Sequence, residues 1–126
     1  MTDFDSLAEK DGIRVLYGSI PNSGAIALPS AVCLDISTLY SESRRVTMLA
    51  HELGHIETGA LYTAEASQIV RTQAETRARR WAIRRLISRD EIADLIRDGY
   101  TEPWQMAEKK GLSEETIREA IKYYFQ

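Results

Sequence analysis

The sequence predicts an α+β protein in which a small three-stranded sheet packs on one long helix and a helical C-terminal half follows. Three short apolar runs, at residues 13–17, 24–28 and 31–36, have strand length and are separated by Gly, Pro, Asn and Ser. From residue 46 onward, apolar residues recur every three or four positions, as they do on helices. Strands followed by helices indicate a small antiparallel or mixed sheet that covers one side of the first long helix.

The length and the 44% hydrophobic content of the chain favour one domain over residues 1–126, with a core at 13–90 and a helical tail at 91–126. A formal net charge of −3 predicts no overall attraction to nucleic acid or to a membrane surface. No apolar run approaches the roughly 20 residues that span a bilayer, and the N-terminus lacks signal-peptide features. We therefore expect a cytoplasmic protein.

The N-terminal part is expected to contain a short helix at residues 6–10 and then the strands. Turn-forming residues at 18–24 predict a hairpin between the first two runs. Pro29 and Ser30 separate the second run from the third. Cys33 is the only cysteine, which excludes an internal disulfide, and its apolar neighbours predict a buried, inert thiol.

The segment at residues 47–58 contains both histidines of the chain, His51 and His55, four residues apart. On a helix they project from the same face, so that both imidazoles can bind one ion. Glu52 lies about 100° round the helix from His51, where it reaches a water on the ion but not the ion itself. This H-E-x-x-H pattern is typical of zinc peptidases, in which the glutamate acts as general base.

The helix around the two histidines is expected to be buried, with Ser41 or Ser43 as its N-cap. Four apolar side chains form an arc opposite the histidines: Val46, Leu49, Leu53 and Ile56. Gly54 lies in the middle of this helix, where glycine costs about 1 kcal/mol relative to alanine. We therefore expect another backbone to pass close beside Gly54.

A second helix is predicted at residues 71–89. Its inward face repeats every four residues and is lined by small side chains: Ala74, Ala78, Ala82 and Leu86. The segment also carries seven arginines and only one acidic residue, Glu75. We interpret the arginines as a solvated face paired with acidic residues that follow, namely Asp90, Glu91, Asp94 and Asp98. The other interpretation is a basic surface for an acidic partner.

A catalytic zinc site usually has three protein ligands, so the two histidines need a third. The nearby carboxylates are Glu57, Glu65, Glu75 and Asp90. Glu57 is expected to point away, and Glu65 stays open as an alternative. Glu75 is preferred because an antiparallel helix packed through small residues can present it to the histidines. An ion pair with Arg71 or Arg79 is its other interpretation.

The motif His51-Glu52-Leu53-Gly54-His55, followed after nineteen residues by Glu75, resembles the ImmA/IrrE metallopeptidase family. The second motif of that family is similar at five further places: Ala78, Trp81, Ala82, Leu86 and Ile87. The resemblance covers roughly residues 13–90. The chain departs from the pattern of many members at Arg77, Arg79 and Ser88.

The resemblance implies a zincin-like endopeptidase of a phage or mobile element that cleaves a helix-turn-helix transcriptional repressor. Its implied zinc ligands are His51, His55 and Glu75, and Glu52 would be the catalytic base. A further electrophile, Tyr62 or Tyr40, stays open. The alternative is a non-catalytic binding module that acts on a repressor by contact, against which the presence of Glu52 argues.

The tail is predicted to form three short helices, at 91–97, 103–110 and 114–125, with Gly111 at a turn and Ser113 as a cap. Residues 106–119 have a helix-turn-helix-like pattern. The second helix of this pattern begins with acidic residues, which disfavours contact with DNA phosphates, so no direct nucleic-acid binding is expected. We also predict that substrate adds a strand to the exposed edge of the sheet, beside the metal cleft.

Overall fold

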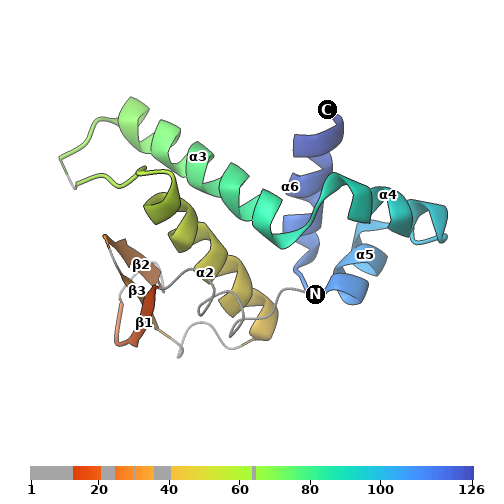
Figure 1. Ribbon diagram of the computed structural model, residues 1–126, viewed down its shortest axis with the longest axis horizontal. Coiled ribbons are helices and arrows are strands. Elements are labelled where there is room, and N and C mark those ends of the chain that lie inside the picture. Colours follow the sequence, from red (N-terminus) through yellow and green to blue (C-terminus); the bar gives the residue numbers. More distant parts are fainter. Residues whose placement is uncertain (1–12, 21–24, 30, 36–40, 64) are drawn as a thin grey trace.

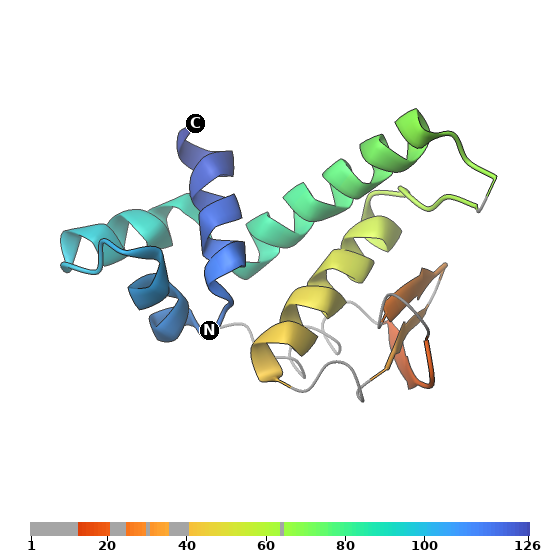
Figure 2. The same ribbon diagram turned by 180° about the vertical axis from the view of Figure 1, so that it is seen from behind.

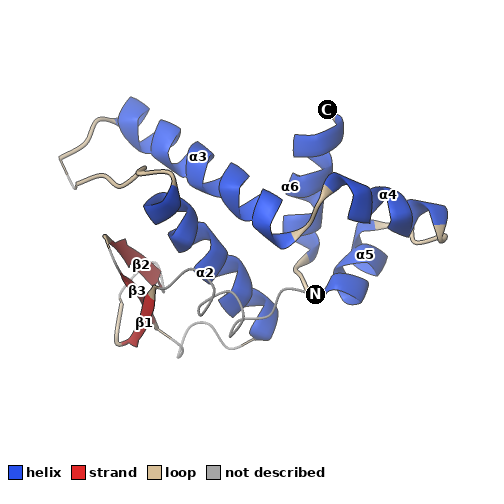
Figure 3. Ribbon diagram, in the orientation of Figure 1, coloured by secondary structure: helices blue, strands red, loops and turns tan. Residues whose placement is uncertain are grey.

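The computed structural model describes residues 13–20, 25–29, 31–35, 41–63 and 65–126. Helix α2 (Glu42–Glu57) lies between a small sheet and helix α3 (Gln68–Leu86), and contacts both (Figures 1 and 2). Three shorter helices gather at the C-terminal end of α3: α4 (Arg89–Arg97), α5 (Pro103–Lys110) and α6 (Glu114–Phe125) (Figure 3). This arrangement confirms the predicted α+β fold. The helix predicted at residues 6–10 lies outside the described residues.

The sheet contains β1 (Arg14–Tyr17), β2 (Ala25–Leu28) and β3 (Ala31–Leu34) in the order β1-β3-β2. Strand β3 pairs in parallel with β1 and antiparallel with β2. The predicted hairpin between the first two runs is therefore wrong, because β3 lies between them. Val32 and Leu34 of β3 are fully buried, whereas β1 is largely exposed, so the most apolar strand takes the centre. Cys33 is half-buried, less buried than predicted.

Helices α2 and α3 pack at very short range. An added Cβ on Gly54 would lie 2.5 Å from the carbonyl oxygen of Ala78, so only glycine fits there. This confirms the predicted close approach of a second backbone. Ala74, Ala78 and Ala82 line the contact and are buried. On the opposite side of α2, the predicted arc is buried at Val46, Leu49 and Leu53 and half-buried at Ile56.

Capping side chains determine where the helices begin and end. The Ser41 hydroxyl accepts a hydrogen bond from the backbone N–H of Arg44 and begins α2. Helix α3 ends at Leu86, three residues before the predicted end, because Ser88 and Glu91 form a capping box that begins α4 at Arg89. Helices α5 and α6 begin and end as predicted, with Gly111 in the left-handed conformation (φ 68°) and Ser113 as the cap of α6.

The α3 arginines do not all pair as predicted. Glu91 of α4 pairs with Lys110 at 2.9 Å, and Asp94 pairs with an arginine of its own helix. Arg79 instead lies 4.0 Å from Glu119 of α6. The arginine face of α3 is thus directed partly toward the last helix of the chain.

One hydrophobic cluster joins the sheet to the C-terminal helices. Its fully buried side chains include Leu34 of β3, Leu49 of α2, Ile92 of α4, Met106 of α5 and Ile117 of α6. These contacts hold α6 against α3, beside the N-terminal half of α2. None of the described helices combines the length and the apolar character needed to cross a bilayer.

Candidate metal centre

Three side chains with metal-binding chemistry converge between α2 and α3. His51 and His55 lie one turn apart on α2, with ring centroids 5.0 Å apart, and Glu75 reaches them from α3. One potential ligand atom from each residue lies within 4.8 Å of the others. The close contact of Gly54 with Ala78 makes this possible, because Glu75 is one turn before Ala78 on the same helix.

The Glu75 carboxylate lies close to both histidines and to Tyr62. Its Oε2 lies 2.7 Å from Nε2 of His51, and its Oε1 lies 3.3 Å from Nε2 of His55. The hydroxyl of Tyr62 donates a hydrogen bond to Oε1 at 2.7 Å. Both oxygens of Glu75 therefore face groups that a carboxylate can bind, and Tyr62 fixes its orientation.

The tautomer of His55 leaves its Nε2 able to bind a cation. Nδ1 of His55 lies 2.7 Å from the carbonyl oxygen of Ala60, which can only accept, so Nδ1 carries the proton. In the neutral imidazole, Nε2 then presents a lone pair to Oε1 of Glu75. Two acceptors at 3.3 Å repel each other unless a cation lies between them or the ring takes a second proton.

The geometry fits a tetrahedral metal ion. Two imidazoles and one carboxylate are a ligand set that zinc favours, and bonds of about 2.0–2.2 Å separate tetrahedral ligand atoms by roughly 3.4 Å. The separation of 3.3 Å between His55 and Glu75 already has this value. The pair formed by His51 and Glu75, at 2.7 Å, is a hydrogen bond that would open slightly around an ion. The backbone acceptor on Nδ1 of His55 orients that ring, as is usual for metal-binding histidines.

Glu52 lies beside the cluster and is almost completely buried, with 8% of its surface exposed. Burial raises the pKa of Glu52 to about 7, and the negative charge of Glu75 adds to this, while His55 and the backbone of Ala27 act in the opposite direction. A carboxyl with this pKa takes up and releases a proton near neutral pH. Glu52 is thus suited to proton transfer in a way that an exposed glutamate is not.

Burial also shifts the pKa values of the cluster itself. It lowers the pKa of His51, although the hydrogen bond to Glu75 opposes the shift. For Glu75, burial acts to raise the pKa, but hydrogen bonds from Tyr62 and His51 outweigh it and keep the pKa below its usual range. The pair is therefore favoured as a neutral imidazole and a carboxylate, which are the forms that bind metal.

A hollow of about 290 Å³ opens beside these residues. Glu52, His55 and Glu75 line one side of it. Residues 25–27 of β2 line another, together with Leu61 and Tyr62. Ala27 and Leu61 carry no signal in the sequence, because neither residue type marks a role in lining a cleft.

The other candidates from the sequence lie elsewhere. Glu57, Glu65 and Asp90 are exposed, and none of them belongs to the cluster around the two histidines. Of the two tyrosines considered as electrophiles, Tyr62 contacts Glu75 and lines the hollow, whereas Tyr40 lies outside the described residues. Among these carboxylates of the described residues, Glu75 is the one that lies beside both histidines.

Comparison with known families gives a match over nearly the whole chain. Residues 8–122 match the family described as Peptidase_M78, IrrE N-terminal-like domain. Among curated proteins the comparison finds no match. The match includes the two histidines, Glu52, Glu75 and the C-terminal helices. The chain therefore belongs to the IrrE N-terminal-like family of metal-dependent peptidases.

Proposed function

We propose that the protein is a zinc-dependent endopeptidase that hydrolyses a peptide bond in a protein partner. His51, His55 and Glu75 would hold the ion, and Glu52 would act as general base. The observation that carries the proposal is the position of Glu52. It is buried beside the metal cluster, lines the same hollow as His55 and Glu75, and has a pKa raised to about 7.

A bound zinc ion supplies Lewis acidity for the peptide carbonyl and lowers the pKa of water toward about 7. Glu52 accepts a proton from the attacking water and then returns it to the leaving amine. A pKa near the working pH suits both transfers. Tyr62 keeps Glu75 ionised and oriented through its hydrogen bond, and its hydroxyl lines the hollow in which the carbonyl would lie.

Strand β2 supports an extended mode of substrate binding. It pairs with β3 on one side, and among the described residues no strand pairs with its other side. The backbone N–H of Ala27 donates a hydrogen bond to the Glu52 carboxylate. Residues 25–27 also line the hollow, so the outer edge of β2 faces it. A substrate segment can add to β2 through main-chain hydrogen bonds, which brings its carbonyl beside Glu52.

The partner we propose is a helix-turn-helix transcriptional repressor of a phage or mobile element, as the family resemblance implies. Direct binding of nucleic acid is not part of this proposal. The first turn of α6 carries Glu114 and Glu115, and Ser113, Glu115 and Thr116 line a hollow next to His51. Because this end of α6 faces α2 and α3, it supports a packing role for the helix-turn-helix-like tail.

The central test is Glu52→Gln. Glutamine has nearly the same shape but cannot take up the proton, so cleavage should fall by about 100-fold or more while zinc and repressor binding persist. The zinc-loaded proteins are incubated with a candidate repressor, and fragments are identified by mass spectrometry. Glu57→Gln, on the exposed end of the same helix, is the matched control. If wild type and Glu52→Gln act equally on an intact repressor, the protein is a binding module and not a protease.

The metal ligands are tested by elemental analysis. Protein purified without added metal should contain one zinc per chain, and His51→Ala with His55→Ala should remove it. Glu75→Ala should weaken zinc affinity far more than Glu65→Ala, because only Glu75 reaches both imidazoles. The opposite ranking would remove Glu75 from the site.

A further inference from the structure

Glu75 lines two hollows, the one beside Glu52 and a second one on the other side of the cluster. A second hollow of about 330 Å³ is lined by His51 and Glu75 and extends to Arg79, Ile83 and Glu119. These last three residues also line a third hollow of about 410 Å³ between α3 and α6. Each hollow shares lining residues with the next, so the three follow one another from β2, past the metal cluster, to the last helix.

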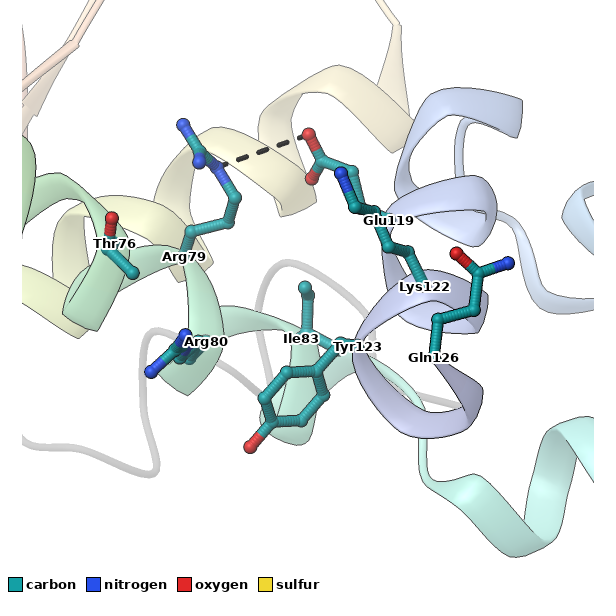
Figure 4. Close-up of a pocket in the computed structure, with 8 residues that line it drawn as sticks. All are labelled: Thr76, Arg79, Arg80, Ile83, Glu119, Lys122, Tyr123 and Gln126. Carbon is teal, nitrogen blue, oxygen red and sulfur yellow. Dashed lines mark ion pairs between the residues drawn. The ribbon is translucent and has the colours of Figure 1, made fainter.

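We call the third hollow the α3–α6 groove, lined chiefly by Arg79, Arg80, Ile83, Glu119, Lys122 and Tyr123. Figure 4 shows Arg79 of α3 and Glu119 of α6 reaching toward each other across it, with Ile83 and Tyr123 between the two helices. Three cations and one carboxylate among these residues leave an excess of two positive charges. The apolar parts of Ile83 and Tyr123 add a surface on which a side chain can pack.

Glu119, the one acidic side chain among the described residues that line the groove, is weakly engaged. Arg79 and Glu119 are 4.0 Å apart, and their side chains are 50% and 40% exposed. An ion pair this long and this exposed contributes little to stability, so a ligand carboxylate can replace Glu119 at low cost. Arg80 is exposed as well.

We propose that the α3–α6 groove binds an acidic side chain of the peptide substrate, two to four residues from the bond cleaved at the metal centre. This proposal rests on the proposed peptidase function. The distance follows from the helix, since Arg79 and Ile83 lie one and two turns beyond Glu75, or about 6 and 12 Å along α3. An extended peptide advances about 3.3 Å per residue, which covers that distance in two to four residues.

An acidic peptide fits the groove better than a nucleic acid does. The positive charges are confined to a short site, and Glu115 and Glu119 of α6 line the hollow that adjoins it. A polyanion that followed the groove toward the metal cluster would meet both carboxylates, whereas one aspartate or glutamate meets three cations and the single carboxylate of Glu119. The chain as a whole carries a formal charge of −3.

The test is a cleavage profile of the zinc-loaded full chain on a library of short random peptides, read by mass spectrometry. Aspartate and glutamate should be enriched at one position, two to four residues from the cleaved bond. Replacing that residue by asparagine or glutamine in the best peptide should lower kcat/KM about fivefold to tenfold. Cleavage without any acidic preference would overturn the inference and leave the peptidase function standing.

Charge reversal identifies the groove as the source of the preference. In the double variant Arg80→Glu, Lys122→Glu the enriched residue should change from acidic to basic, while Arg77→Glu, on the same helix outside the groove-lining set, should keep the acidic preference. Should no peptide be cleaved, fluorescence anisotropy of the labelled acidic and amide peptides decides the inference separately from the function. Equal affinity for both peptides, or tighter binding of a single-stranded oligonucleotide that the double variant abolishes, would overturn it.

Discussion

The α2–α3 pair and the C-terminal helices are packed by different means. Between α2 and α3 the contact consists of Gly54 and a row of alanines, and buried polar groups such as Glu52 and His55 lie beside it. The C-terminal helices pack through large apolar side chains and have capping boxes at the starts of α4 and α5.

The difference shows where stability and chemistry are located. Small residues bring two backbones close enough for Glu75 to meet two histidines, but they bury little apolar surface, and each buried polar group opposes folding. Large residues such as Ile92, Met106 and Ile117 bury more apolar surface and do not require two backbones to come close together. The C-terminal helices therefore stabilise a metal-binding pair that is weakly stabilised by its own contacts.

The largest expected effect is on the C-terminal side. Ile117→Ala removes a fully buried side chain and should lower the free energy of unfolding by about 2–5 kcal/mol. The folded fraction should still bind one zinc per chain, because Ile117 lies outside the cluster. Thermal unfolding and elemental analysis of the same sample measure both. Loss of zinc from protein that remains fully folded would contradict the division between the two regions.

A smaller loss of stability with a larger loss of metal is expected at Gly54. Gly54→Ala places a Cβ against the Ala78 carbonyl and should destabilise the fold by about 1–3 kcal/mol, since the helices must separate. The separation moves Glu75 away from the histidines, so zinc affinity should fall as well. Gly18→Ala is the control, because an added Cβ there meets nothing within 4 Å. Unchanged zinc affinity in Gly54→Ala would show that the close contact does not position the site.

The smallest expected effects are changes in the free energy of unfolding of the metal-free protein, caused by replacing one glutamate in each region. The pKa of Glu52 rises from 4.5 to about 7 on folding, so its ionisation opposes folding increasingly between these values and fully above them. Glu52→Gln should therefore stabilise the metal-free protein by about 1–2 kcal/mol at about pH 8 and hardly at all at about pH 4. The gain is smaller than the free energy that corresponds to the pKa shift, because a buried glutamine side chain is also polar.

Glu91 of α4 should behave in the opposite way. Burial acts to raise its pKa, but hydrogen bonds from Lys110 and Ser88 outweigh it and lower the pKa. The ionised Glu91 side chain stabilises the fold above the pKa that it has in the unfolded chain. This stabilisation is lost as the pH falls through its pKa in the folded protein. Glu91→Gln should thus destabilise by less than about 1 kcal/mol at neutral pH, with a difference that fades in acid. Thermal unfolding in EDTA across this pH range measures the stability of both variants. A change of stability in the same direction for both would contradict the comparison.

The sequence was informative where structure depends on neighbours along the chain. Four-residue spacing paired His51 with His55, the alanine row predicted a close helix, and cap residues marked α5 and α6. It was less informative for contacts between distant segments. The order of the sheet depends on which strand is buried most, so β3 in the centre was missed. The pairing of Arg79 with Glu119 was also missed, because the position of α6 opposite Arg79 follows from the packing of the whole C-terminal half.

Among the described residues no strand pairs with the outer edge of β2, and this matters for the protein at high concentration. An unpaired strand edge can accept a strand from a second copy of the same chain as well as one from a substrate. Two chains joined through β2 would each cover the hollow beside the other's Glu52. Such a pair would be self-inhibited, so that activity per molecule would fall as the protein is concentrated and return on dilution.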